Sequence, residues 1–124
     1  MTTLADTSLS EQERRVLERL ALLLEEAYGP DLEAVWLYGS RARGEPRREE
    51  SDVDVLVIVS GGDEAELRRR VFDLKYEAAK AEDAEAAFFS VVVATPEWLA
   101  GRREIDAFFI LEVDRDKVVL FGER

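Results

Sequence analysis

Two acidic residues at the start of an apolar run are the side chains of this sequence best suited to chemistry. Asp52 and Asp54 open the run Asp-Val-Asp-Val-Leu-Val-Ile-Val, whose β-branched residues are typical of a strand buried on both faces. Side chains alternate along a strand, so both carboxylates should project from one face, with Cα atoms roughly 6.5–7 Å apart. Carboxylates this close repel each other and lose hydration, which a divalent cation would compensate. The pair therefore indicates a metal site; the alternative is a strand that simply begins in solvent.

A glycine turn precedes these acids in the chain. Gly39-Ser40 follows the apolar run 34–38, and a glycine there allows a sharp turn that brings the backbone close to a ligand. Backbone N–H groups and a serine hydroxyl at such a turn can hold a phosphate. Arg41 and Arg43 stand beside it, and guanidinium groups match phosphate oxygens in pairs. We therefore interpret all four residues as phosphate-binding, against the alternative of a polar turn with solvated arginines.

The composition excludes several kinds of chemistry. The 124 residues include no Cys and no His, which excludes disulfides, thiol nucleophiles, imidazole bases and Cys/His zinc sites. Any metal must be held by oxygen ligands, which favours Mg²⁺, Mn²⁺ or Ca²⁺. A net charge of −11 would repel nucleic-acid backbones, so we expect no general nucleic-acid binding. Neither a membrane span nor a signal peptide is indicated, so we expect a cytoplasmic protein.

The elements that must position these residues follow from their periodicity. Ser10 and Glu13 have the spacing of a capping box, and leucines then recur at helical spacing up to Gly29-Pro30. The pattern predicts helices over 10–28 and 63–81, strands over 34–38, 52–59, 86–94 and 117–121, a loop over 41–51, a short helix from Thr95-Pro96, and a helical turn or two within 105–113. This order predicts one domain over 1–124 with an α+β fold (an α/β sandwich), in which helices flank a small mixed sheet.

The motifs resemble those of a known family, the minimal nucleotidyltransferases of the DNA polymerase β superfamily. The signature of that family is Gly-Ser, a short spacer, and then Asp-x-Asp on the next strand. In this sequence 11 residues separate Ser40 from Asp52. The matching strings are Gly39-Ser40-Arg41-Ala42-Arg43-Gly44 and Ser51-Asp52-Val53-Asp54. In layout the resemblance covers almost the whole chain.

The resemblance implies a polymerase β-like nucleotidyltransferase fold and a mechanism. A nucleoside triphosphate, expected to be ATP, would lie with its phosphates on the Gly39-Ser40 turn. Asp52 and Asp54 would be the catalytic and metal-binding residues, with Mg²⁺ or Mn²⁺ as cofactor. An acceptor hydroxyl would attack the α-phosphorus and pyrophosphate would leave, so AMP would be transferred. Such a reaction depends on positioning and charge neutralisation and needs neither His nor Cys.

One position departs from the family pattern. Family members carry a third carboxylate on the following strand, and laying that pattern on Phe89 to Glu97 places it at Ser90. A serine can neither neutralise a second metal ion nor take the acceptor proton. Three acids that precede the strand could substitute, but we interpret them as charges at a helix end. They are Glu82, Asp83 and Glu85.

Two hypotheses on function follow from the resemblance. Minimal domains of this family are commonly encoded beside a HEPN-type protein, with which they form toxin–antitoxin pairs. The first hypothesis is therefore an enzyme that transfers AMP to a hydroxyl of a protein or a small molecule, with the HEPN-domain partner as a candidate acceptor. The second is a catalytically weak or inactive nucleotide-binding module that acts as an antitoxin by protein contact, for which Ser90 would be the sign and an acidic surface would suit a basic partner.

Two apolar features admit a structural interpretation. Trp36 and Tyr38 belong to the strand before the turn, and we interpret them as core and sheet packing rather than as a platform for a nucleotide base. The run 108–111, Phe-Phe-Ile-Leu, is apolar enough to form an interface, and a homodimer is one alternative.

Overall fold

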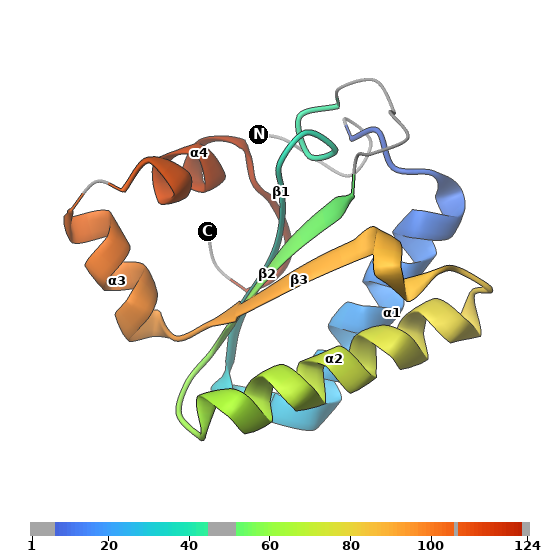
Figure 1. Ribbon diagram of the computed structural model, residues 1–124, viewed down its shortest axis with the longest axis horizontal. Helices are drawn as coiled ribbons and strands as arrows, with labels where there is room; N and C mark the ends of the chain where they lie inside the picture. The colour runs from blue at the N-terminus through green and yellow to red at the C-terminus, as the bar shows by residue number, and fades with distance from the viewer. Residues whose placement is uncertain (1–6, 45–51, 106, 123–124) are drawn as a thin grey trace.

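The structure is a four-stranded sheet with helices on both faces (Figure 1). The computed structural model describes residues 7–44, 52–105 and 107–122. In chain order its elements are α1 (Glu11–Tyr28), η2 (Gly29–Asp31), β1 (Leu32–Tyr38), β2 (Val53–Val59), α2 (Glu64–Ala81), η3 (Ala86–Phe88), β3 (Phe89–Ala94), α3 (Pro96–Glu104), α4 (Phe108–Asp116) and β4 (Val118–Gly122). The predicted α+β fold with a mixed sheet is confirmed.

The sheet is mixed because its connections differ in length. Strand β2 pairs antiparallel with β1 and parallel with β3, and β1 pairs antiparallel with β4. The resulting order is β3-β2-β1-β4. Helix α2 makes the crossover between the two parallel strands, as such a pair requires. Strand β2 therefore lies inside the sheet, which explains why its sequence is almost continuously apolar.

Alternation along β2 divides the core into two clusters. The valines at odd positions from Val53 to Val59 pack among residues of α1 and α2. Leu56 and Ile58 point to the other face, where they pack with residues of α3 and α4. All of these β2 side chains are at most 1% exposed. The two helix pairs thus cover opposite faces of the sheet (Figure 1).

Helix α4 is attached to the sheet by one stripe of its surface. Ile110 and Val113 are buried against the cluster that contains Trp36, whereas Phe108 and Leu111 are exposed. The ammonium group of Lys117 lies 3.6 Å from the centre of the Trp36 ring. The run 108–111 is therefore split between the core and the surface, because successive helical residues point in different directions.

The predicted helix starts are confirmed by side-chain caps. Ser10 and Glu13 form the complete capping box of α1, Asp63 accepts from the N–H groups of Ala65 and Glu66, and Thr95 accepts from that of Trp98. These contacts satisfy N–H groups that the first turn of a helix leaves without an internal partner.

Within the described ranges, no helix is long and apolar enough to cross a membrane.

Two predicted boundaries were wrong. The strand expected over 86–94 begins only at Phe89, because Ala86–Phe88 close a 3-10 turn in which the Phe88 N–H bonds to the Glu85 carbonyl. The helical turns expected within 105–113 form three residues later, as Phe108–Asp116, since Ile105 still closes α3 through the Gly101 carbonyl. The predicted loop 41–51 begins as a turn up to Gly44, and 45–51 lies outside the described residues.

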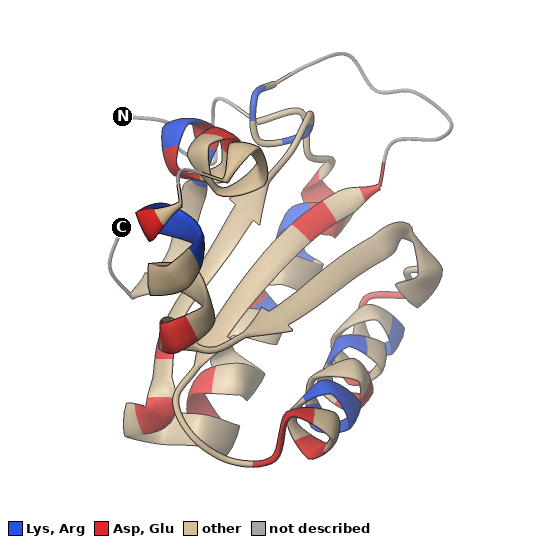
Figure 2. Ribbon diagram, turned by 60° about the vertical axis from the view of Figure 1, so that its left-hand side comes forward, with Lys and Arg blue, Asp and Glu red and all other residues tan. Residues whose placement is uncertain are grey.

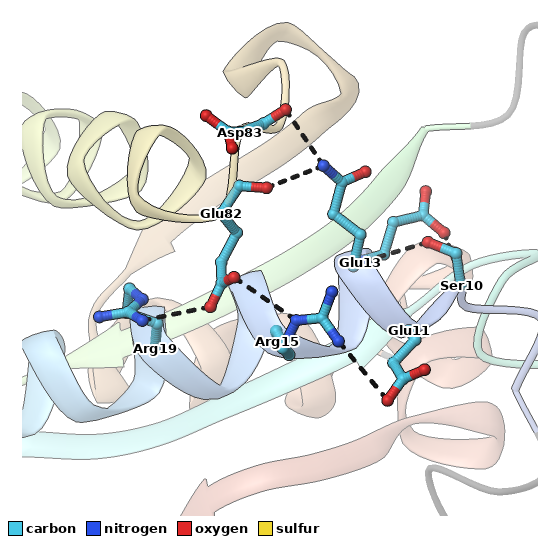
Figure 3. Close-up of polar contacts among 8 residues, drawn as sticks. Ser10, Glu11, Glu13, Arg15, Arg19, Glu82 and Asp83 are labelled. Atoms are coloured by element: carbon cyan, nitrogen blue, oxygen red, sulfur yellow. Dashed lines mark hydrogen bonds and ion pairs between the residues drawn. The ribbon is translucent and has the colours of Figure 1, made fainter.

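A polar clasp joins α1 to the end of α2 (Figure 3). The carboxylate of Glu82 lies 3.4 Å from Nε of Arg15 and 3.1 Å from Nη2 of Arg19. The side-chain amide of Gln12 donates to the carbonyl groups of Glu82 and Asp83, at 2.8 and 3.1 Å. Glu82 is thus committed to the helix pair, which matches its interpretation as a charge at a helix end.

Truncating the α4 anchor tests this packing. Ile110→Ala should lower the free energy of unfolding by about 2–4 kcal/mol, because it leaves a cavity between α4 and the sheet. Leu111→Ala, at the adjacent position where the side chain is 48% exposed, should change it by less than about 0.5 kcal/mol. Urea unfolding followed by circular dichroism measures both, and equal losses would contradict the docking of α4 by its Ile110 face.

Candidate functional site

The two predicted carboxylates lie where β2 begins. Asp54 has the parity of Leu56 and Ile58, so its side chain belongs to the face covered by α3 and α4. Asp52 immediately precedes the strand and is exposed, whereas Asp54 is half-buried. Acidic residues are visible at this end of β2 in Figure 2. The structure therefore presents one carboxylate to solvent and draws the next into the protein on a shared face.

The neighbouring strands place two polar side chains on either side of Asp54. Tyr38 at the end of β1 is its partner in the antiparallel register, and Ser90 on β3 is its partner in the parallel register. Partners in register present their side chains to the same face of a sheet. Ser90 thus stands on the next strand beside Asp54, in the register position that the family resemblance predicts for a third acid. Lys75 donates to the carbonyl of Phe89 at 3.0 Å and so holds the start of β3.

The local electrostatics disfavour an ionised Asp54. Burial raises the pKa of the Asp54 carboxyl above its ordinary value, and the like charge of Asp52 raises it further. Burial also raises the pKa of Tyr38 to about 12, with the Asp54 charge adding to the shift. Neither cause of the Asp54 shift involves a positive charge from the described residues, and a bound cation would relieve both causes.

Gly39 brings the turn directly against Asp54. Its φ angle of +80° lies in the left-handed region, which side-chain-bearing residues rarely adopt. A Cβ atom built on Gly39 would lie 2.6 Å from Oδ2 of Asp54, closer than any real Cβ contact. The Gly39 carbonyl then accepts from the N–H groups of Ala42 and Arg43 and closes the turn. A glycine is therefore required here both by the backbone angle and by the carboxylate.

The structure does not place Arg41 where a phosphate ligand was expected. Its side chain is 2% exposed and forms an ion pair with Glu13 of α1. Its Nε and Nη2 groups also donate to Ser8, at 3.1 Å to the hydroxyl and 3.0 Å to the carbonyl oxygen. The guanidinium group was expected to pair with the oxygens of a triphosphate. It is instead directed to the α1 side of the sheet, away from the face of Asp54.

Arg43 remains at the rim of the site. It is exposed, and its Nη1 lies 3.8 Å from the carboxylate of Asp116 at the end of α4. Of the two predicted arginines, only Arg43 therefore has its side chain near solvent.

Helix α4 borders the candidate site, which the sequence did not predict. Phe109 contacts the edge of the Tyr38 ring, with centroids 5.4 Å apart, and lies 6.4 Å from the Trp98 ring. Tyr38 thus packs against aromatic side chains on the α3 and α4 face of the sheet, in agreement with its interpretation as sheet packing. It is also the register partner of Asp54. No spacing in the sequence could join Phe109 to Tyr38, because the contact depends on how α4 docks.

The donor set fits one divalent cation better than two. Asp52 and Asp54 supply hard carboxylate oxygens, which Mg²⁺ and Mn²⁺ prefer. Among the residues that the structure describes, no three His, Cys, Asp or Glu side chains are grouped as a metal site. With Ser90 as the third neighbour, two acids from this chain would hold the ion, and substrate phosphates would have to complete its coordination.

Comparison with protein families identifies the family of this chain. A family model described as a nucleotidyltransferase domain matches residues 17–119, which include the turn and both acids. The chain belongs to the nucleotidyltransferase domain family. No curated protein sequence matches it closely enough to count as a relative.

Solved structures share the fold of this nucleotidyltransferase domain. A toxin–antitoxin crystallised with AMP-PNP is 22% identical with a TM-score of 0.51, and the match covers 86% of this chain and 74% of that one. A mutant of the toxin–antitoxin MntA-HpeT is 20% identical, with a TM-score of 0.51 and the same coverage of 86% and 74%. At this identity the likeness concerns the fold.

Neutralising Asp54 should stabilise the metal-free protein. Because its folded pKa is raised above the ordinary 3.8, the favourable contribution of this group is present below its unfolded pKa and is lost as pH rises through the folded pKa. Asp54→Asn should therefore be more stable than the wild type at about pH 7.5, and the difference should vanish toward about pH 4. Urea unfolding with a chelator measures this. The exposed helix residue Asp73 supplies the control Asp73→Asn, and equal effects of both variants at neutral pH would contradict the assignment.

Proposed function

We propose that this chain transfers AMP from ATP to a hydroxyl of a protein partner, a HEPN-domain protein in a toxin–antitoxin pair. The observation that carries the proposal is the contact between turn and carboxylate. Gly39 approaches Oδ2 of Asp54 so closely that no side chain fits between them. A phosphate held by the turn would therefore lie within reach of a cation held by Asp52 and Asp54.

Family membership and the structural neighbours support the choice of reaction. The match to the nucleotidyltransferase domain covers residues 17–119, from within α1 to the start of β4. One neighbour of the same fold was crystallised with AMP-PNP, an ATP analogue, and both neighbours are toxin–antitoxin complexes. These observations favour ATP over other triphosphates and a partner protein over a small molecule as acceptor.

Each site residue has a defined part in the proposed reaction. The Gly39-Ser40 turn holds the phosphates, and Arg43 at the rim adds positive charge toward them. Asp52 and Asp54 hold Mg²⁺ or Mn²⁺, which when bound neutralises phosphate charge and polarises the reacting phosphate. The acceptor oxygen bonds to the α-phosphorus as the bond to pyrophosphate breaks, and the acceptor proton passes to water. The chain supplies orientation and charge, in keeping with its lack of His and Cys.

Ser90 supports a second candidate function. A neutral side chain in register with Asp54 leaves the site with two carboxylates where the family pattern has three. Such a site would bind nucleotide with one cation but transfer slowly. The alternative is therefore a nucleotide-binding antitoxin that acts by protein contact, with its net charge of −11 suited to a basic partner.

Calorimetric titration with ATP tests the nucleotide site. Wild-type protein should bind ATP in the presence of Mg²⁺, and Asp52→Asn/Asp54→Asn should lose this metal-dependent binding because the cation has lost both ligands. The control Asp31→Asn/Asp73→Asn changes the charge equally, at two exposed acids outside the site, and should bind as the wild type does. No binding by the wild type at millimolar ATP would reject the nucleotide site.

Restoring the third acid separates the two candidate functions. Ser90→Asp should increase transfer of labelled AMP to the product of the neighbouring gene by on the order of ten-fold or more, since a second cation could then be held. Ser90→Asn matches the size of aspartate without its charge and should give no increase. Binding of ATP without transfer, in the wild type and in Ser90→Asp, would favour the contact-only antitoxin.

A further inference from the structure

A buried ion pair connects the glycine turn to the first turn of α1. Arg41 follows Ser40 directly in the chain, and its guanidinium pairs with Glu13 in the interior of the protein. Both side chains are almost completely covered, with Arg41 2% exposed and Glu13 7%. A charge pair so well buried is costly to desolvate, and removing one partner would leave the other uncompensated.

Hydrogen bonds between Ser8 and Arg41 run in both directions and reinforce this connection. The Ser8 N–H donates to the Arg41 carbonyl at 3.0 Å, while the Arg41 side chain donates back to the Ser8 carbonyl and hydroxyl. Ala42, the next residue, is fully buried in the core beneath α1 and α2. The turn is thus attached to the α1 side of the sheet at Arg41 and Ala42, while Gly39 faces Asp54 on the other side.

Glu13 has two roles at once. Its Oε1 accepts from the Ser10 N–H at 2.8 Å, completing the capping box of α1 (Figure 3), and the same atom pairs with Arg41. The cap itself requires only an acceptor, because glutamine serves at this position as well as glutamate. The negative charge is therefore needed for Arg41 and not for the helix start.

We propose that Arg41 and Glu13 are positioning residues of the nucleotide site, which hold the Gly39-Ser40 turn at the distance from Asp54 that phosphate binding needs. The inference deepens the proposed function and rests on it for its effect on ATP. It assigns the arginine next to the Gly-Ser motif to the rear of the turn instead of to the triphosphate. It also gives Glu13, in the first turn of α1, a role in shaping the site.

Glu13→Gln tests the proposal because it removes the charge and keeps the cap. We expect the variant to bind ATP with Mg²⁺ about ten-fold more weakly in calorimetric titration. The matched variant Ser10→Ala removes the other half of the capping box and keeps the ion pair. It should lower the thermal midpoint while leaving ATP affinity within about twofold of the wild type. A direct phosphate contact by Arg41 predicts the opposite for Glu13→Gln, unchanged or tighter binding, since a competing anion is removed.

Amide hydrogen exchange supplies a readout that does not depend on ATP. The N–H groups of Ala42 and Arg43 close the turn on the Gly39 carbonyl, and in Glu13→Gln their exchange should be faster by about ten-fold, with no comparable change in Ser10→Ala. Unchanged exchange in Glu13→Gln would overturn the positioning role. If the wild type binds no ATP but Glu13→Gln still exchanges these N–H groups faster than the wild type does, the positioning role is retained and the proposed function is rejected, so the two failures are distinguishable.

Discussion

The candidate site depends on the carboxylate of Asp54, which the protein partly removes from water and places beside the like charge of Asp52. Asp54 lies on the central strand between the Gly39 backbone and the like charge of Asp52, and burial raises its pKa. Burial and the like charge both disfavour the charged form of this side chain. In the proposed function, a cation bound with phosphates would offset this cost.

The two faces of the sheet contribute differently to this arrangement. On one face, α1 and α2 pack on the valines of β2 and hold Arg41 and Ala42 behind the turn. On the other face, α4 brings Phe109 against Tyr38 and Asp116 near Arg43, bordering the acids. The first helix pair therefore sets the position of the phosphate turn, while the second shapes the space in front of it. Strands β1 and β2 contribute residues to both clusters, so the sheet connects the helices on its two faces.

The register between β2 and β3 places Ser90 beside Asp54. A one-residue slip would move its side chain to the opposite face, but the parallel pairing of Asp54 with Ser90 places both on one face. In the proposed function, the two carboxylates would neutralise phosphate charge through a single cation. Among the described residues no third acid is grouped with them to take the acceptor proton or hold a second ion, which is the basis of the alternative that the site binds nucleotide without efficient transfer.

The sequence by itself determined the elements and the candidate members of the site. Local signals were sufficient for these: the Ser10, Asp63 and Thr95 caps, the β-branched run after Asp52, and the Gly-Ser and Asp-x-Asp spacing with the family it resembles. Only the tertiary structure decided which groups meet. Arg41 and Arg43 are alike in the sequence, yet one pairs with Glu13, 28 residues away, and the other lies at the rim beside Asp116. The approach of Gly39 to Asp54 and of Phe109 to Tyr38 likewise depends on packing between segments far apart in the chain. Periodicity and capping act over a few residues, whereas burial of a charge and close backbone approach are properties of the assembled core.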